Sequence, residues 1–162
     1  MPRLSPAAAG GANVCAFLDL IAWSEGTDNG SQPTRDQGYD VVVGGGLFSS
    51  YADHPRRLVD LPALGIKSTA AGRYQILSRY WDHYRDSLGL VGGFTPENQD
   101  RIALQLISEC RALNDIQAGR IAQAIHKCRS RWASLPGAGY GQHEHKVEPL
   151  LAAYSKAGGV FA

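Results

Sequence analysis

Glycine and proline divide this chain into short stretches, and that division limits the folds it can adopt. The 19 glycines and eight prolines exceed the average and follow no regular period, so they indicate loops. Apolar residues at helical spacing predict helices over residues 14–25, 72–88, 95–110, 116–132 and 144–157. β-Branched residues around a glycine turn predict a hairpin with strands at residues 39–43 and 47–51. The predicted fold class is therefore α+β, mainly helical, with one small hairpin, and residues 53–67 form a long irregular loop.

The chain has a size and a charge typical of one compact domain. Its 162 residues fit a single core, which we place at residues 14–162, after a flexible N-terminal leader at residues 1–13. A net charge of +1 excludes a polybasic arm, so we expect no nucleic-acid partner. Residues 101–162 are more basic than the rest; this fits solvated helix faces, and a surface for an anionic polymer is the alternative.

Sequence features that direct a protein to a membrane or an oxidising compartment are missing. No apolar run reaches the ~18 residues of a membrane span, and no apolar core of a signal peptide follows Met1. We therefore expect synthesis in the cytoplasm and no stable membrane association. Cys15, Cys110 and Cys128 are an odd number without Cys-x-x-Cys spacing, which indicates core thiols rather than a disulfide framework or a zinc cluster.

Glu25 is the first candidate for chemistry. It falls in the last turn of the predicted helix 14–25, where Gly26 is suited to end the helix. The negative end of the helix dipole and the apolar stripe beside Trp23 both disfavour the carboxylate, so they raise its pKa. A carboxyl that stays protonated near neutral pH is a general acid. From position alone, an ordinary exposed glutamate is the simpler alternative.

Two further segments suggest ligand contacts. Small residues run from Ser68 to Gly72 and allow close approach of a backbone, while the amide of Gln75 suits a sugar hydroxyl or acetamido group. Glycines around Gly139 permit a lip, and the ring of Tyr140 could stack on a sugar. A tight helix entry and a plain linker are the respective alternatives.

Motifs of other enzyme classes are absent or incomplete. His143-Glu144-His145 supplies only part of a zinc ligand set, so we expect no metal. There is no Gly-x-Ser-x-Gly elbow, no P-loop and no dinucleotide-binding glycine motif. Serine hydrolases and nucleotide-binding enzymes are thereby excluded.

Four segments together resemble the bacteriophage lambda endolysin family. In order, they are Ala22-Trp23-Ser24-Glu25-Gly26-Thr27-Asp28-Asn29-Gly30, Gly38-Tyr39-Asp40-Val41-Val42-Val43-Gly44-Gly45, Gly72-Arg73-Tyr74-Gln75, and Trp132-Ala133-Ser134-Leu135-Pro136-Gly137-Ala138-Gly139-Tyr140-Gly141-Gln142. The resemblance covers roughly residues 17–159. Residues 1–14 have no counterpart in it, and residues 64–66 and 91–93 lie in loops slightly longer than the family pattern.

The resemblance implies a lysozyme-like fold with its small hairpin beside an active-site cleft. It implies cleavage of peptidoglycan between N-acetylmuramic acid and N-acetylglucosamine by lytic transglycosylation, with host lysis as the result. Glu25 corresponds to the catalytic acid of the family. The residues expected to bind substrate are Asp40, Ser68, Tyr74, Gln75, Gly139, Tyr140 and Gln142.

The resemblance also implies where such an enzyme works and with what. The expected partner is the glycan strand; a holin and a spanin act in the same lysis pathway without direct contact. We expect a monomer without a cofactor, in the host cytoplasm until the membrane is permeabilised and then in the periplasm.

Three other functions remain open at this point. A hydrolytic muramidase would add Asp28, Asp36 or Asp40 as a second carboxylate. A zinc peptidase would use His143 and His145 to cut stem peptides. A non-catalytic wall-binding module is the third, although it would not need Glu25.

Overall fold

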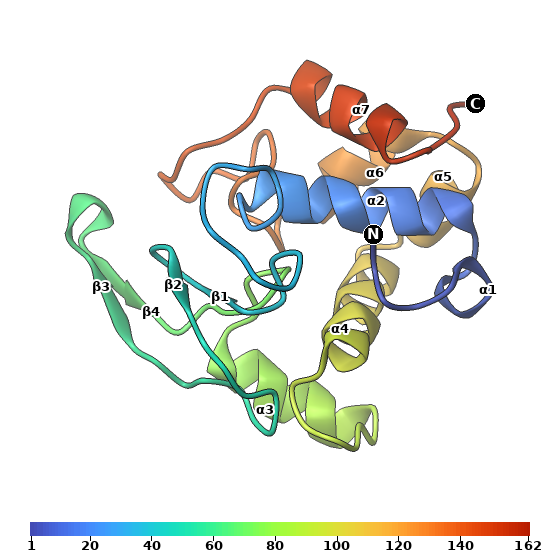
Figure 1. Cartoon of the computed structure of the whole chain (residues 1–162). Helices are drawn as coiled ribbons and strands as arrows, with labels where there is room; N and C mark the ends of the chain where they lie inside the picture. Colours follow the sequence, from blue (N-terminus) through green and yellow to red (C-terminus); the bar gives the residue numbers. More distant parts are fainter.

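The computed structural model describes all 162 residues. The helices are α1 (Pro6–Ala9), α2 (Ala12–Ser24), α3 (Ser78–Ser87), α4 (Pro96–Glu109), α5 (Leu113–Gln117), α6 (Ile121–Cys128) and α7 (Val147–Lys156). The strands are β1 (Val41–Val42), β2 (Gly46–Leu47), β3 (Val59–Leu61) and β4 (Ile66–Ser68), with a 3-10 turn at Pro62–Leu64. The helices gather on one side of the molecule and the strands project on the other (Figure 1).

Helix α2 is the centre of the helical side. Most of its residues are buried, and it lies against α7 and α5. Gly26 follows its end with φ +74°, a left-handed conformation that glycine adopts without strain, as the sequence predicts. Thr95 caps α4 by accepting from the Asn98 N–H at 3.3 Å, with Pro96 in the first turn, so the helix begins where the predicted helix 95–110 does.

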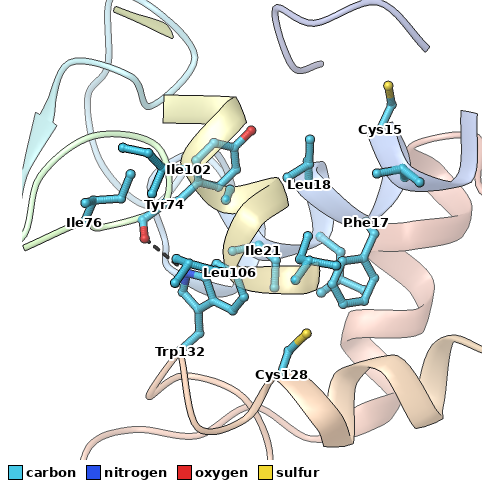
Figure 2. Packing of buried hydrophobic residues seen from close by; sticks show 14 of the residues in the cluster. Cys15, Phe17, Leu18, Ile21, Tyr74, Ile76, Ile102, Leu106, Cys128 and Trp132 are labelled. Atoms are coloured by element: carbon cyan, nitrogen blue, oxygen red, sulfur yellow. Dashed lines mark hydrogen bonds between the residues drawn. The ribbon is translucent and has the colours of Figure 1, made fainter. Parts of the chain in front are cut away.

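The core joins the helices to the turn at residues 71–77. In Figure 2, Tyr74 and Ile76 lie beside Ile102 and Leu106 of α4, and the Trp132 ring closes this cluster. The indole N–H of Trp132 donates to the Tyr74 carbonyl at 3.1 Å, drawn as a dashed line. None of the helices has the length and hydropathy needed to cross a membrane.

The strands form two separate antiparallel hairpins. β1 pairs with β2, with Val41 opposite Leu47, and β3 pairs with β4, with Leu61 opposite Ile66. The prediction of an irregular loop at residues 53–67 is therefore confirmed for residues 53–58 and wrong for residues 59–67. Pro62 and Gly65 lie in the turn between the two strands.

Residues 1–13 also differ from the expected flexible leader. The backbone N–H groups of Arg3 and Leu4 donate to Asp100 Oδ2 at 2.7 and 2.9 Å, and the Leu4 side chain is buried. Ser5 caps the short α1. The buried Asp100 carboxylate needs donors to compensate for its lost hydration, and the start of the chain supplies two of them.

Two predicted helices have different bounds in the structure. The helix expected from residue 72 begins at Ser78, because residues 71–76 form a tight turn closed by pairing of Ala71 with Ile76. The helix expected over residues 116–132 is divided into α5 and α6. Gly119 separates them with φ +75°, and the backbone of residues 160–162 packs so closely against it that a Cβ atom would clash.

Candidate active site

Glu25 lies at the end of α2, where its backbone N–H donates to the Ile21 carbonyl at 2.9 Å. Its side chain is half-buried and lines two cavities, which extend to either side of it. The cavities have Val43, Gln75 and Gln142 in common as well, so they form one continuous groove. Their open volumes are about 850 and 1050 Å³.

Two walls enclose the groove. We call residues 59–68 the hairpin wall; it contributes Leu61, Leu64, Ile66 and Ser68. We call residues 130–145 the loop wall; its lining residues are Ser130, Arg131, Trp132, Ala133, Ser134, Gln142, His143 and His145. Glu25 lies between the walls and is the one carboxylate that lines either cavity.

The surroundings of Glu25 favour its protonated form. Burial raises the pKa of Glu25 to about 7, well above the ordinary value of 4.5. Hydrogen bonds from Ser134 act in the opposite direction, because they stabilise the carboxylate. A carboxyl with a pKa near neutrality can both release and accept a proton under physiological conditions.

A group of hydrogen bonds fixes the carboxyl. Ser134 Oγ donates to Glu25 Oε1 at 2.5 Å and lies 2.7 Å from Ser24 Oγ. His145 contacts both serines: its backbone N–H donates to the Ser134 carbonyl at 2.9 Å, and Nε2 donates to the Ser24 carbonyl at 3.0 Å. The loop wall is thereby attached to the end of α2.

Four of the residues expected to bind substrate line the groove, and apart from Tyr74 they are Ser68, Gln75 and Gln142. Ser68 reaches it from β4, Gln142 from the loop wall, and Gln75 from the turn before α3. Gln75 has φ +51°, an unusual conformation for a residue other than glycine, and its side chain donates to the Gly72 carbonyl at 3.0 Å. These polar groups come from three elements and converge on the cavity beside Glu25.

Gly139 and Tyr140 lie at the outer end of the loop wall. The Tyr140 ring is 56% exposed, while its hydroxyl donates to the Ser130 carbonyl at 2.8 Å. The carboxylate of Glu144 accepts from the N–H groups of Gly137 and Gly139 at 2.8 and 2.7 Å. Neither Gly139 nor Tyr140 lines the two cavities, so a glycan would meet them only beyond the groove.

Tyr74 and Asp40 differ from the expectation that their side chains contact substrate. Tyr74 belongs to the cavity wall, but its hydroxyl turns inward and donates to Asp100 Oδ1 at 2.7 Å. Asp40 is 5% exposed and accepts from Thr34 Oγ1 at 2.6 Å and from the Arg35 N–H at 3.0 Å. Both side chains thus satisfy buried hydrogen-bonding groups and hold the fold beside the site.

The remaining carboxylates considered as a second catalytic group have partners elsewhere. Asp28 accepts from the buried guanidinium of Arg73 at 2.6 Å, and this guanidinium also pairs with Asp19 in α2. Asp36 pairs with Arg3 and accepts from the Tyr51 hydroxyl at 2.7 Å. Neither residue lines the groove around Glu25.

His143 and His145, the two candidate zinc ligands, are engaged in contacts within the protein. His143 and His145 stack edge to face with ring centroids 4.9 Å apart, but His145 Nε2 is occupied by the Ser24 carbonyl. Burial lowers the pKa of His145, which favours the neutral ring. No group of three or more His, Cys, Asp or Glu side chains is placed to hold a metal ion.

Sequence reasoning missed Ser134 and His145. Ser134 belongs to one of the four segments quoted above, yet nothing in its local pattern relates it to Glu25, which lies 109 residues earlier. The sequence pattern indicates His145 only as a candidate metal ligand. Their roles arise from tertiary contacts that no local spacing encodes.

Comparisons with known proteins agree with this geometry. A family model described as Endolysin matches residues 15–161. The chain is 62% identical to the Endolysin of Escherichia phage lambda over 145 residues, which are 89% of this chain and 90% of that protein. It is 52% identical to the Endolysin of Escherichia phage P2 over 157 residues, 91% of this chain and 94% of the relative.

Solved structures extend the likeness to the fold. The bacteriophage lambda lysozyme complexed with a chitohexasaccharide superposes with a TM-score of 0.90 at 55% identity, over the whole of both chains. A second structure of lysozyme from bacteriophage lambda gives 0.86 at 53% identity, again over both whole chains. The predicted α+β, lysozyme-like fold is confirmed. The chain belongs to the endolysin family, as the resemblance implied, and within it to the lambda type, the phage enzymes that lyse peptidoglycan.

Proposed function

We propose that this endolysin is a lytic transglycosylase that cuts the β-1,4 bond between N-acetylmuramic acid and N-acetylglucosamine. The observation that carries the proposal is that Glu25 is the one carboxylate lining the groove. Retaining and inverting hydrolases need two carboxyl groups, ~5–5.5 Å or ~6.5–9.5 Å apart. Asp28, Asp36 and Asp40 are held by other groups outside the groove, so a single-carboxyl reaction fits better.

The first step uses Glu25 as a general acid. Its proton passes to the glycosidic oxygen, the bond between that oxygen and C1 of the muramic ring breaks, and the N-acetylglucosamine residue leaves with a free 4-hydroxyl. Positive charge develops at C1. The carbonyl oxygen of the substrate's own 2-acetamido group stabilises it, in place of a protein nucleophile.

The second step uses the same group as a base. The Glu25 carboxylate takes the proton of the C6 hydroxyl, and O6 attacks C1 of the same ring. A 1,6-anhydro bond forms, Glu25 is again protonated, and no water is consumed. Attack within one residue has a high effective concentration, which favours it over water. The pKa of about 7 supports both roles, because neither form of Glu25 is strongly disfavoured at neutral pH.

The groove supplies a binding site for the glycan strand. The lambda lysozyme structure holds a chitohexasaccharide, and this chain has the same fold, so we propose that sugars occupy the groove on both sides of Glu25. Ser68, Gln75 and Gln142 offer hydrogen bonds to hydroxyl and acetamido groups. Gly139 and Tyr140 form a lip where the exposed aromatic face stacks on a sugar ring.

The enzyme must cross the inner membrane of the host to reach its substrate. The enzyme accumulates in the host cytoplasm and reaches the peptidoglycan only when a holin permeabilises the inner membrane, after which a spanin acts on the outer membrane. It works as a monomer without a cofactor. When the protein is expressed alone in a Gram-negative host, we expect lysis only after the membrane is permeabilised; prompt lysis without that treatment would contradict this route.

Analysis of the products tests the reaction. Purified peptidoglycan digested by the enzyme should yield fragments with 1,6-anhydromuramic ends, each one water lighter than its hydrolytic counterpart and resistant to borohydride. Reducing ends as the main product would instead identify a hydrolytic muramidase. Cleaved stem peptides, with activity lost in EDTA, would identify a metal-dependent peptidase.

A further inference from the structure

We propose that Ser134 is a positioning residue for catalysis. Its hydroxyl donates a hydrogen bond to Glu25 Oε1, so that Oε2 carries and exchanges the catalytic proton. The hydroxyl proton of Ser134 is directed at Oε1 over 2.5 Å. An oxygen that accepts so short a hydrogen bond is a poor place for the acidic proton. This inference rests on the proposed role of Glu25 and assigns the division of labour between its two oxygens.

The orientation of the Ser134 hydroxyl is set by a second serine. A hydroxyl has one proton, and that of Ser134 is given to Glu25. Ser24 Oγ, 2.7 Å away, must therefore be the donor in the contact between the two serines. The two hydroxyls form a chain that runs from Ser24 through Ser134 to Glu25 Oε1, and both protons point toward the carboxyl.

The backbones of both serines are held by one residue. His145 donates its N–H to the Ser134 carbonyl and its Nε2–H to the Ser24 carbonyl. The His145 ring packs against Trp23 with ring centroids 4.9 Å apart. The Ser134 backbone therefore cannot move away from the end of α2 without breaking these hydrogen bonds.

Charged neighbours do not set the protonation of Glu25. The other titratable or charged groups that line the groove are Tyr74, Tyr80, Arg131, His143 and His145. The pKa of Glu25 is nevertheless governed by two causes, burial and the hydrogen bonds from Ser134. Removing the Ser134 hydroxyl removes a hydrogen bond that lowers the pKa of Glu25, while burial continues to raise it. The pKa of Glu25 should therefore rise further.

The first test compares Ser134→Ala with Ser134→Thr, which keeps the hydroxyl. The loss of a hydrogen bond to the Glu25 carboxylate corresponds to an upward shift of about one pH unit or more in the Glu25 pKa. In Ser134→Ala we expect the alkaline limb of the kcat profile to move up by that amount. We also expect kcat to fall about tenfold with little change in KM, because a less constrained carboxyl is less often correctly placed. Ser134→Thr should restore both, and Ser155→Ala on the exposed face of α7 is the matched control.

The second test does not depend on activity. Carbon-13 NMR titration of the Glu25 carboxyl in the ligand-free protein should show the same upward shift in Ser134→Ala, and a smaller one in Ser24→Ala. An unchanged Glu25 pKa in a folded Ser134→Ala protein would overturn the proposal. A rise in the KM of Ser134→Ala with no change in kcat would also overturn it. If Ser134→Ala does not fold, the Ser24→Ala titration decides in the same way. Failure of the transglycosylase proposal would appear separately, in the chemistry of the products.

Discussion

The two walls of the groove are built in opposite ways. The hairpin wall has no hydrogen bond to the helices; apart from its strand pairing, its hydrogen bonds are local, as from the Ala70 N–H to Ser68 Oγ. Its apolar side chains Leu64 and Ile66 are each 41% exposed. The loop wall is anchored by Trp132, Ser134 and His145, which hydrogen-bond to the turn before α3 and to the end of α2.

This difference separates the tasks of the two walls. The reacting carboxyl is hydrogen-bonded to the loop wall, which is itself fixed by hydrogen bonds to the end of α2 and to the turn before α3. A catalytic group needs such support because it must be placed within a fraction of an ångström. The opposite wall offers exposed apolar surface, which suits sliding contact with the faces of sugar rings. We therefore expect changes in the loop wall to affect mainly kcat and changes in the hairpin wall to affect mainly KM.

The largest effect should come from Glu25 itself. Glu25→Gln keeps the volume and can still accept from Ser134, but it supplies no proton. General acid catalysis contributes ~10²–10⁴-fold, so the variant should retain less than about one hundredth of the activity in a turbidity assay on purified peptidoglycan. A folded variant with more activity than this would show that Glu25 is not the acid.

The same variant should change stability in a pH-dependent manner. The pKa of Glu25 is raised in the folded protein, so the native state favours the protonated form. Its contribution to stability is fully present below the unfolded value of about 4.5 and is lost as the pH rises through about 7. Glu25→Gln avoids this loss and should be more stable than the parent protein by about 1–3 kcal/mol at pH 8, but not at pH 4. Urea denaturation at the two pH values measures this, and equal differences at both would contradict the raised pKa.

The next largest effect should follow from loosening the loop wall. His145→Ala removes the hydrogen bond to the Ser24 carbonyl and the packing on Trp23, so we expect kcat to fall about tenfold with KM nearly unchanged. Steady-state kinetics on a soluble glycan oligomer would measure both constants. His126→Ala, exposed on α6, is the matched control. A fall reversed by added zinc would instead support a metal role.

A smaller effect is expected at the lip. Tyr140→Ala should weaken oligosaccharide binding by about two- to tenfold, the range of one aromatic stacking contact, with the melting temperature nearly unchanged. Tyr140→Phe keeps the ring and loses only the hydrogen bond to Ser130, so it should bind nearly as well as the parent protein. Calorimetric titration with the oligosaccharide distinguishes them. Equal losses in both variants would assign the effect to the hydrogen bond rather than to stacking.

The smallest effect belongs to the hairpin wall. Leu64→Ala shortens an exposed side chain of the groove, and we expect KM to rise about threefold with kcat unchanged. Leu58→Ala, at an exposed position just before β3 and outside the groove, is the control. A kcat effect as large as that of His145→Ala would remove the distinction between the walls.

The sequence predicted those parts of the site that depend on local pattern. The end of α2 at Glu25 and Gly26, and the start of α4 at Thr95 and Pro96, follow from capping preferences that act within a few residues. The β3–β4 hairpin escaped prediction because its three-residue strands are too short to show an alternating pattern. The break between α5 and α6 escaped because the close approach to Gly119 comes from the far end of the chain.

The side chains that surround Glu25 depended even more on tertiary structure. Asp40 and Tyr74 lie in segments that flank the groove, but their polar atoms point to Thr34 and Asp100, and only the folded chain reveals these directions. The four segments of the resemblance line or flank the groove around Glu25, whereas the directions of their side chains depend on burial, which local sequence does not encode.

The central claim, that one carboxyl performs both steps without water, is tested most directly by cleavage in water enriched in oxygen-18. Transglycosylation forms the new bond with O6 of the same sugar, so we predict anhydromuramic products that contain no label. Hydrolysis would place one labelled oxygen at C1 of each new end. Products labelled at C1 would contradict the account and require a second group that activates water.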